Sequence, residues 1–293
     1  MPLRTLLFAP GNHVRRVEKV FGTGADAVIL DLEDAVAMSE KRATRRLVVE
    51  ALQRPRSCAG YVRVNAMDTE FCFGDVSEVV QPGVDGIMLP KIETASDLHT
   101  MDWMITQLER ERGLAVGAID LLPIVETGKG IDAIREIAQA GTRVRRFAFG
   151  AGDFTLDLNL TWTAEEDELS YARAALVTAS RAAGLEPPVD SVWVRLDDEA
   201  GLQNSAAYVA RTGYQGKMCI HPAQIPVVNR VFTPSDEEVA RSERIVSAFA
   251  EAEASGNAAF QLDGKFIDYP IVYRAQRVLE TIRAVRKLAD RAS

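Results

Sequence analysis

Five short apolar runs in this sequence each end in polar or charged residues of the kinds that do chemistry. The clusters contain, in chain order, Asp31 with Glu33 and Asp34, Arg63 with Asn65, Lys91, Glu126, and Asp153. In a closed parallel barrel the carboxyl ends of all strands meet at one rim, so residues far apart in sequence become neighbours there. Reactive groups placed repeatedly at strand ends are typical of a (β/α)8-barrel enzyme.

Glu126 and Asp153 are the best candidates for a metal site. Both follow purely apolar segments and both are bordered by small residues, so we expect them to face each other from the fifth and sixth strands. Two carboxylates without a nearby His or Cys form a hard-oxygen site, which suits Mg²⁺ that keeps several waters and takes substrate oxygens. The alternative is that either residue caps the helix that follows it.

Arg63 ends a buried-looking strand, so its guanidinium is expected at the barrel mouth, where it can bind a carboxylate in a bidentate pair. Its alternative role is to neutralise Asp31, Glu33 or Asp34 on the neighbouring strand, and both roles are compatible. The acidic triplet can position Arg63, hold metal-bound water or cap a helix.

Other residues at the predicted rim give weaker indications. Residues Pro10, Gly11 and Asn12 close the first strand and open a helix, where free backbone amides can hold an anion or a carbonyl oxygen. Lys91 and Lys129 could form a Schiff base, although nothing in the sequence shows that either is desolvated. His221 could act as an acid or base, but a hydrogen-bonded structural role is the stronger expectation.

Composition narrows the class of protein. The 293 residues are 47% hydrophobic and 26% charged, as expected for a globular protein with an ample core. The formal charge of -8 disfavours nucleic-acid binding. Three cysteines without C-x-x-C spacing predict neither a disulfide framework nor a zinc ribbon. With no signal-like start and no apolar run long enough to span a membrane, we expect a cytoplasmic protein without membrane partners.

Eight apolar runs alternate with segments of helical period, as in βαβ units of a parallel sheet. The expected strands are Thr5–Ala9, Ala27–Leu30, Tyr61–Val64, Gly86–Leu89, Leu121–Val125, Arg146–Phe149, Ser191–Val194 and Lys217–Ile220. The expected helices cover residues 13–22, 39–53, 74–81, 94–112, 129–140, 164–183, 199–212 and 223–230. The sequence therefore predicts a TIM barrel over residues 1–231, followed by a C-terminal helical extension or lid over 232–293.

Local patterns mark several element ends. Thr163 with Glu166, and Ser235 with Glu238, have the spacing of capping boxes, in which a hydroxyl and a carboxylate satisfy the first amides of a helix. Gly184 and Gly213 fall where helices are expected to end. Beyond about residue 234 we expect one amphipathic helix at 235–254, a loop containing Asp263-Gly264, and a last helix near 270–290.

Seven motifs taken together resemble the citrate lyase β-subunit-like branch of the HpcH/HpaI aldolase superfamily, in order over almost the whole chain. They cover residues 7–12, 28–36, 62–65, 88–93, 123–127, 149–154 and 216–225. The resemblance implies a Mg²⁺-dependent carbon–carbon lyase on a TIM barrel, acting on a 3-hydroxy-acid thioester such as malyl-CoA, citramalyl-CoA or a citryl thioester. Its products would be acetyl-CoA and a 2-keto acid.

The resemblance also implies roles for individual residues. The family's metal-binding Glu and Asp match Glu126 and Asp153, and its substrate-binding Arg matches Arg63. Residues 261–270 look like a C-terminal segment that covers the active site of a neighbouring subunit and brings a catalytic acid, here Asp268. Such a lid requires a homo-oligomer, for which a trimer or a hexamer fits. The chain departs from the usual motif at Gly152, where relatives carry an acid.

Two rival functions remain open at this stage. One is the β subunit of a multi-subunit citrate lyase, which handles citryl groups on an acyl-carrier protein. The other is a non-catalytic barrel that binds acyl-CoA or another metabolite. A thioesterase side reaction is also open, and the sequence does not distinguish glyoxylate, pyruvate and oxaloacetate as the keto product.

Overall fold

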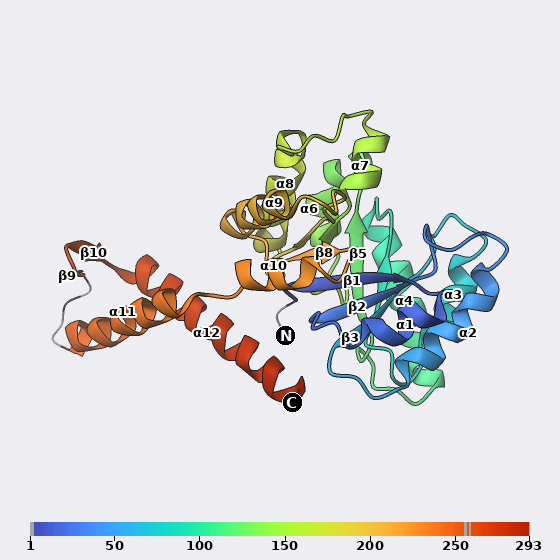
Figure 1. Cartoon of the computed structure of the whole chain (residues 1–293), viewed down its shortest axis with the longest axis horizontal. Helices are drawn as coiled ribbons and strands as arrows, with labels where there is room; N and C mark the ends of the chain where they lie inside the picture. The colour runs from blue at the N-terminus through green and yellow to red at the C-terminus, as the bar shows by residue number, and fades with distance from the viewer. Residues whose placement is uncertain (1–2, 255–256, 258, 293) are drawn as a thin grey trace. The chain divides into compact units, whose positions relative to one another are not determined.

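The computed structural model describes residues 3–254, 257 and 259–292 of the chain, which form two compact units (Figure 1). The larger unit is Leu3–Asn229, and the smaller begins at Arg230. The larger unit is a closed parallel barrel in which each strand pairs with the next and the eighth returns to the first. The predicted (β/α)8 TIM barrel is confirmed. Its strands are β1 (Thr5–Pro10), β2 (Ala27–Asp31), β3 (Ala59–Arg63), β4 (Gly86–Leu89), β5 (Asp120–Val125), β6 (Ala148–Phe149), β7 (Val189–Asp190) and β8 (Gly216–Cys219).

Alternation along the strands decides which side chains fill the barrel. The interior cluster takes every second residue of a strand, for example Ala27 and Ile29 of β2, and Leu122 and Ile124 of β5. Continuing this alternation to the strand ends places Asp31, Arg63 and Glu126 on the interior side. The same packing that builds the core therefore directs these three side chains into the mouth.

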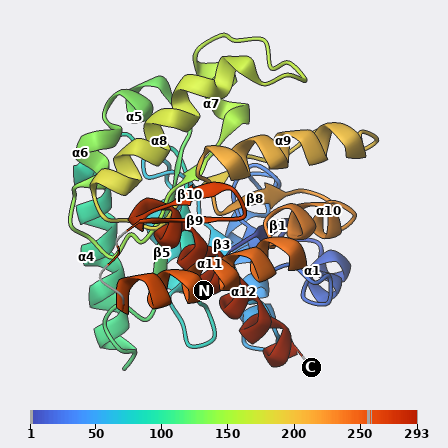
Figure 2. The same cartoon turned by 90° about the vertical axis from the view of Figure 1, so that its left-hand side faces the viewer.

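Helices cover the outside of the strands (Figures 1 and 2). Those of the barrel unit are α1 (Val14–Val20), α2 (Lys41–Leu52), α3 (Cys72–Val79), α4 (Ala95–Glu111), α5 (Gly128–Asp132), α6 (Ile134–Ala138), α7 (Ala151–Asp157), α8 (Ser170–Ala182), α9 (Glu199–Thr212) and α10 (Gln224–Val231), with a 3-10 turn at Asp167–Leu169. Most lie where the sequence predicts them. The segment expected as one helix over 129–140 is two short helices that meet at Ala133.

Two predictions on the β6–β7 side of the barrel were wrong. The seventh strand is Val189–Asp190, not Ser191–Val194. The strand ends in a fully buried aspartate that pairs with Lys217 and Arg173, so a charged residue here belongs to the strand and not to the loop after it. The helix expected over 164–183 begins only at Ser170, and α7, which follows β6 directly, was not predicted.

The predicted helix ends are partly confirmed. Gly184 and Gly213 have φ of 73° and 108°, the left-handed conformation that ends a helix. Thr163 accepts a hydrogen bond from the Glu166 amide at 3.2 Å, but the reciprocal acceptor is Glu168, 2.7 Å from the Thr163 amide. The Glu166 carboxylate instead turns inward, so the expected capping box there is only half formed.

The smaller unit contains α11 (Asp236–Ala254), a hairpin of β9 (Phe260–Leu262) and β10 (Lys265–Ile267), and α12 (Tyr269–Ala292). Ser235 and Glu238 form the predicted capping box. The loop at Asp263-Gly264 is a two-residue hairpin turn with φ of 49° and 73°, which these residue types favour. Among the described residues, no helix is long and apolar enough to cross a membrane.

Candidate functional site

The barrel brings the predicted rim residues together at the carboxyl ends of its strands. Asp31 and Arg63 are the last residues of β2 and β3 and are register partners. Glu126 follows β5 directly. Asp153 lies in the first turn of α7 rather than at the end of β6 itself, since the chain passes from strand to helix at Gly150.

Arg63 is the centre of this cluster. Its Nε and Nη2 donate to the two carboxylate oxygens of Asp31 at 2.8 and 2.6 Å, a bidentate pair. Its Nη1 lies 2.9 Å from Glu33 Oε2 and 3.5 Å from Asp34 Oδ2. The guanidinium also lies over the Phe8 ring, 5.0 Å from its centroid. The predicted neutralising role of Arg63 is confirmed for all three acids of the triplet.

The acids of the triplet differ in their environments. Burial favours the protonated form of Asp31, but the charge and hydrogen bonds of Arg63 outweigh it and lower the pKa of Asp31. Its oxygens also accept the amides of Glu33 and Ala35 at 2.9 and 3.0 Å, so Asp31 shapes the turn after β2. Burial raises the pKa of Glu33 despite the attraction of Arg63. Asp31 is therefore the fixed partner of Arg63, whereas Glu33 is incompletely neutralised.

Glu126 is the most perturbed acid of the rim. Burial and the nearby charges of Asp153 and Glu33 raise its pKa to about 8, and Arg63 only partly opposes them. Asp153 is therefore near enough to Glu126 for its negative charge to disfavour ionisation of the Glu126 carboxyl group. Space for the carboxylate depends on Gly150, because a Cβ at that position would lie 2.2 Å from Glu126 Oε2.

Lys91 joins the site through both its main chain and its side chain. Its amide donates to Glu126 Oε1 at 2.9 Å, which the left-handed backbone at Lys91, φ 54°, makes possible. Its Nζ lies 3.3 Å from Glu33 Oε1 and 3.9 Å from Asp153 Oδ2. Burial disfavours the charged ammonium, yet Glu33 and Asp153 raise the pKa of Lys91 overall. This argues against the Schiff-base alternative, which requires a neutral amine.

A second layer, which the sequence analysis missed, supports the rim. Lys41 is buried, and its Nζ donates to Leu32 O, Glu33 O and Asn65 Oδ1 at 3.0, 2.6 and 2.6 Å. Asn65 in turn donates to Asp75. The sequence around Lys41 does not distinguish it from an exposed lysine on a helix. Only its place at the start of α2, the helix that follows β2, puts it beside the rim.

The expectation for Pro10, Gly11 and Asn12 needs correction. The Gly11 amide is not free, because it donates to Asp31 O at 3.0 Å, and a Cβ at Gly11 would meet the same oxygen at 2.7 Å. Gly11 thus fixes the β1 end against β2 instead of offering an anion site. Asn12 keeps a polar group near the rim: its Nδ2 donates to Glu40, and its buried Oδ1 has no hydrogen-bond partner among the residues that the structure describes.

His221 has the structural role favoured from sequence. It is exposed and its Nδ1 accepts the Ala223 amide at 3.2 Å. Gly152, where the family's usual acid is missing, has a Cβ direction that meets only Trp162 at 3.9 Å, so a larger side chain would fit there.

Asp268 belongs to the smaller unit, where it precedes α12. Its Oδ1 accepts the Ile271 amide at 3.4 Å, and its carbonyl accepts the Val272 amide at 3.0 Å. Within its own unit, Asp268 is therefore the N-cap of α12.

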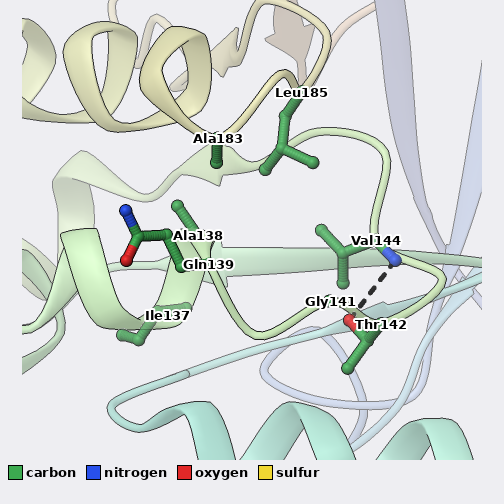
Figure 3. A pocket seen from close by; sticks show the side chains of 8 residues that line it. All are labelled: Ile137, Ala138, Gln139, Gly141, Thr142, Val144, Ala183 and Leu185. Carbon is green, nitrogen blue, oxygen red and sulfur yellow. Dashed lines mark hydrogen bonds between the residues drawn. The ribbon is translucent and has the colours of Figure 1, made fainter.

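One cavity adjoins the rim cluster. It has a volume of about 540 Å³, and its walls include Glu33, Asp34, Lys41, Asn65 and Lys91. A separate cavity of about 250 Å³ between α6 and the end of α8 is lined by residues such as Ile137, Val144 and Leu185 without any charged side chain (Figure 3). Arg63, Glu126 and Asp153 do not line the charged cavity, so the candidate active site is the rim cluster itself, which this cavity borders at Glu33 and Lys91.

Comparison with known proteins identifies the family of the chain. The family model described as HpcH/HpaI aldolase/citrate lyase matches residues 4–222, which is nearly the whole barrel unit. Citrate lyase subunit beta of Leuconostoc mesenteroides subsp. cremoris is 37% identical over 283 residues, which cover 96% of this chain and 93% of that protein. The L-malyl-CoA/beta-methylmalyl-CoA lyase of Rhodobacter capsulatus is 33% identical, over 94% of this chain and 93% of that protein.

A solved structure gives the same result. CitE from Mycobacterium tuberculosis, in complex with magnesium, acetoacetate and coenzyme A, superposes with a TM-score of 0.78 at 29% identity, over 96% of this chain and 98% of that chain. The similarity to both relatives and to this structure extends over the C-terminal segment as well as the barrel. The chain is therefore a member of the HpcH/HpaI aldolase/citrate lyase family and, like these relatives, a lyase.

Proposed function

We propose that this protein is a Mg²⁺-dependent lyase that reversibly cleaves a 3-hydroxy-acid CoA thioester, such as malyl-CoA or citramalyl-CoA, into acetyl-CoA and a 2-keto acid. The observation that carries the proposal is a buried, charge-unbalanced cluster of Arg63, Glu126 and their acidic neighbours at the barrel mouth. It occurs in a chain similar to malyl-CoA lyases and to a CitE structure that contains magnesium and coenzyme A.

The residues at the rim fit a divalent cation. The carboxyl groups of Asp31, Glu33, Asp34, Glu126 and Asp153 face the cationic groups of Arg63 and Lys91, so the cluster has an excess of negative charge. Burial, followed by the negative charges of Asp153 and Glu33, raises the pKa of Glu126 to about 8. Within the part of the chain that the structure describes, no three His, Cys, Asp or Glu residues form a closed metal site. That accords with Mg²⁺ held by one or two carboxylates plus water and substrate oxygens.

The chain's own residues would bind and orient the substrate around that centre. Glu126 and Asp153 would hold the cation, which when bound supplies Lewis-acid polarisation of the oxygens of the acid half. Arg63, fixed by Asp31, would place its remaining N–H donors opposite the substrate carboxylate and the oxygen that gains charge. Partial burial of the cluster strengthens these interactions because water screens them less than at an open surface. Glu33 would help to orient Arg63 at the substrate.

Asp268 is proposed to exchange the proton on the acetyl carbon. In the cleavage the substrate hydroxyl loses its proton and becomes the keto carbonyl, the C–C bond breaks, and its electron pair forms the thioester enolate. The enolate then takes up one proton to give the acetyl group, so no net proton is gained or lost. The family resemblance supports Asp268 in this role, and delivery to the site of a neighbouring subunit would require a homo-oligomer. Closure of such a lid would also exclude water and limit thioester hydrolysis.

The substitution Asp268→Asn tests this assignment cleanly. Asn caps helices about as well as Asp, so α12 should keep its N-cap and the melting temperature should not change. The proton-exchanging group is lost, and kcat should fall by about 10²-fold or more. A steady-state assay beside a melting curve measures both effects. An unchanged kcat would leave Asp268 with the capping role alone.

A second candidate is the β subunit of a multi-subunit citrate lyase. It is favoured by higher identity, since the citrate lyase β subunit of Haemophilus influenzae is 38% identical and that of Leuconostoc 37%, against 33% for the malyl-CoA lyase. The C-terminal segment does not separate the candidates, because the match to those subunits covers 96% of this chain. A citrate lyase subunit would act on a citryl group attached to an acyl-carrier protein.

One experiment distinguishes the candidates. The purified protein is incubated with Mg²⁺, acetyl-CoA and glyoxylate, pyruvate or oxaloacetate in turn, and condensation products are identified by mass spectrometry. A malyl-, citramalyl- or citryl-CoA product that disappears with EDTA and in Glu126→Gln supports a free-standing lyase. Absence of any CoA product, together with co-purification of an acyl-carrier protein, would favour the citrate lyase subunit.

A further inference from the structure

Lys91 has a conformation that its residue type rarely adopts. Its φ of 54° lies in the left-handed region, which is strained for a residue other than glycine. The conformation directs the amide of Lys91 at Glu126 Oε1, at 2.9 Å, and leaves the side chain on the same rim. One residue therefore contacts three carboxylates of the cluster: Glu126 through its main chain, and Glu33 and Asp153 through its ammonium group.

The two cations of the rim are held differently. Arg63 has a side chain that is 12% exposed and makes two hydrogen bonds to Asp31, so it is fixed. The Lys91 side chain is 39% exposed, and its Nζ is 3.3 Å from Glu33 and 3.9 Å from Asp153, the latter beyond hydrogen-bond distance. A flexible, half-exposed ammonium at these distances can leave one carboxylate at little cost, whereas Arg63 cannot.

The position of the Lys91 ammonium also conflicts with a bound divalent ion. Asp153 is a proposed ligand of that ion, and two cations near one carboxylate repel each other. We propose that Lys91 is a placeholder cation, a positioning residue that partly neutralises Glu33 and Asp153 while no divalent ion is bound and withdraws from Asp153 when one binds. This inference rests on the cation site of the proposed function.

The proposal predicts that removing the Lys91 charge tightens metal binding, whereas loss of a merely structural contact would weaken it or leave it unchanged. We would measure the Kd of Mn²⁺ for the full-length, metal-free protein without substrate, by electron paramagnetic resonance. Lys91→Met removes the charge, and Lys91→Gly removes it while keeping the left-handed backbone without strain. Lys91→Arg retains the charge. Lys129→Met is the matched control, because Lys129 is 65% exposed and pairs with Glu93 outside the cluster.

The expected result is a Kd about 5-fold or more lower in Lys91→Met and Lys91→Gly, for loss of one charge a few ångströms from the ion in a partly screened site. Lys91→Arg and Lys129→Met should stay near the wild-type value. An unchanged or higher Kd in both charge-removing variants would overturn the placeholder role while leaving the metal site intact. If the wild type binds no Mn²⁺, or Glu126→Gln binds it equally well, the cation site itself fails.

Discussion

The barrel unit contains two buried clusters of charged side chains. They differ in the balance of acids and bases, and we use this difference to distinguish a structural cluster from a reactive one. Between the barrel and helices α8 and α9, Asp190 lies 2.5 Å from Lys217 and 2.9 Å from Arg173, which also binds Glu166 at 2.9 Å. That cluster contains two acids and two bases. Burial disfavours the charge of Asp190, but Lys217 and Arg173 outweigh it and lower its pKa.

The rim cluster is unbalanced instead. There, acids outnumber bases, and burial together with Asp153 and Glu33 raises the pKa of Glu126. The comparison teaches that burial alone does not mark a reactive site, since Asp190 is the more buried acid. The rim differs because it has more carboxylates than its cationic side chains neutralise. Such a surplus favours binding of an external cation.

The largest expected effect comes from removing a carboxylate of the unbalanced cluster. Glu126→Gln should lower metal-dependent turnover by roughly 10³-fold, since Lewis-acid stabilisation is worth several kcal/mol. Folding should be kept, because an amide can still accept the Lys91 N–H. Steady-state kinetics and circular dichroism measure the two effects. Normal activity in this variant, with EDTA present, would remove the basis for calling the rim reactive.

Removing a carboxylate from the balanced cluster around Asp190 should have the opposite effect: it should lower stability and leave activity unchanged. Asp190→Asn removes the carboxylate that pairs with buried Lys217 and leaves Arg173 with Glu166 alone, so the protein should lose about 3–5 kcal/mol of stability. The activity per folded molecule should remain near wild type because Asp190 points away from the barrel interior. Urea unfolding and active-site-normalised kinetics provide the comparison. Loss of turnover in a fully folded Asp190→Asn protein would contradict the division between the clusters.

Gly150→Ala tests whether the geometry of the unbalanced cluster depends on a missing side chain. The new Cβ would lie 2.2 Å from Glu126 Oε2, so the carboxylate must move. Metal affinity should fall about 10- to 100-fold, as for other changes that misplace a ligand. Gly152→Ala is the control, because its Cβ meets nothing closer than 3.9 Å. Equal Mn²⁺ affinity in the two variants would argue against Gly150 as a determinant.

Per pH unit, the smallest expected effect is the dependence of stability on pH. With its pKa raised to about 8, Glu126 is protonated in the metal-free folded protein at pH values where the unfolded chain has lost that proton. The folded state then binds more protons, so stability should fall as pH rises from about 5 to 8, by at most about 1.4 kcal/mol per unit. Melting curves in EDTA measure this slope. Subtracting the slope of Glu126→Gln isolates the residue, and identical slopes would contradict the raised pKa.

The barrel could be predicted because its strands are apolar runs of ordinary length separated by helical periods. The prediction failed where a strand contains charge. Asp190 is a strand residue only because Lys217, far along the chain, neutralises it, and no local pattern reveals that pairing. The two-residue strands β6 and β7 are likewise defined by their neighbours more than by their own residues.

The site was predictable to the extent that strand order fixes it. Residues at the ends of β2, β3 and β5 converge by topology, and Asp31, Arg63 and Glu126 were found from position alone. Lys41 and the left-handed conformation of Lys91 were not, since they depend on which carbonyls and carboxylates lie within reach in three dimensions. The prediction of a free amide at Gly11 was wrong because this amide donates a hydrogen bond to the Asp31 carbonyl of the neighbouring strand.

The register of β2 and β3 has a consequence for how the protein matures. Asp31 pairs with Arg63 across that register, so slippage by a single residue would send one of them to the helix-covered side. Pairing of β2 with β3 in this register and formation of the Asp31–Arg63 ion pair are therefore a single event, and a chain that has not set the register lacks the centre of the rim cluster as well.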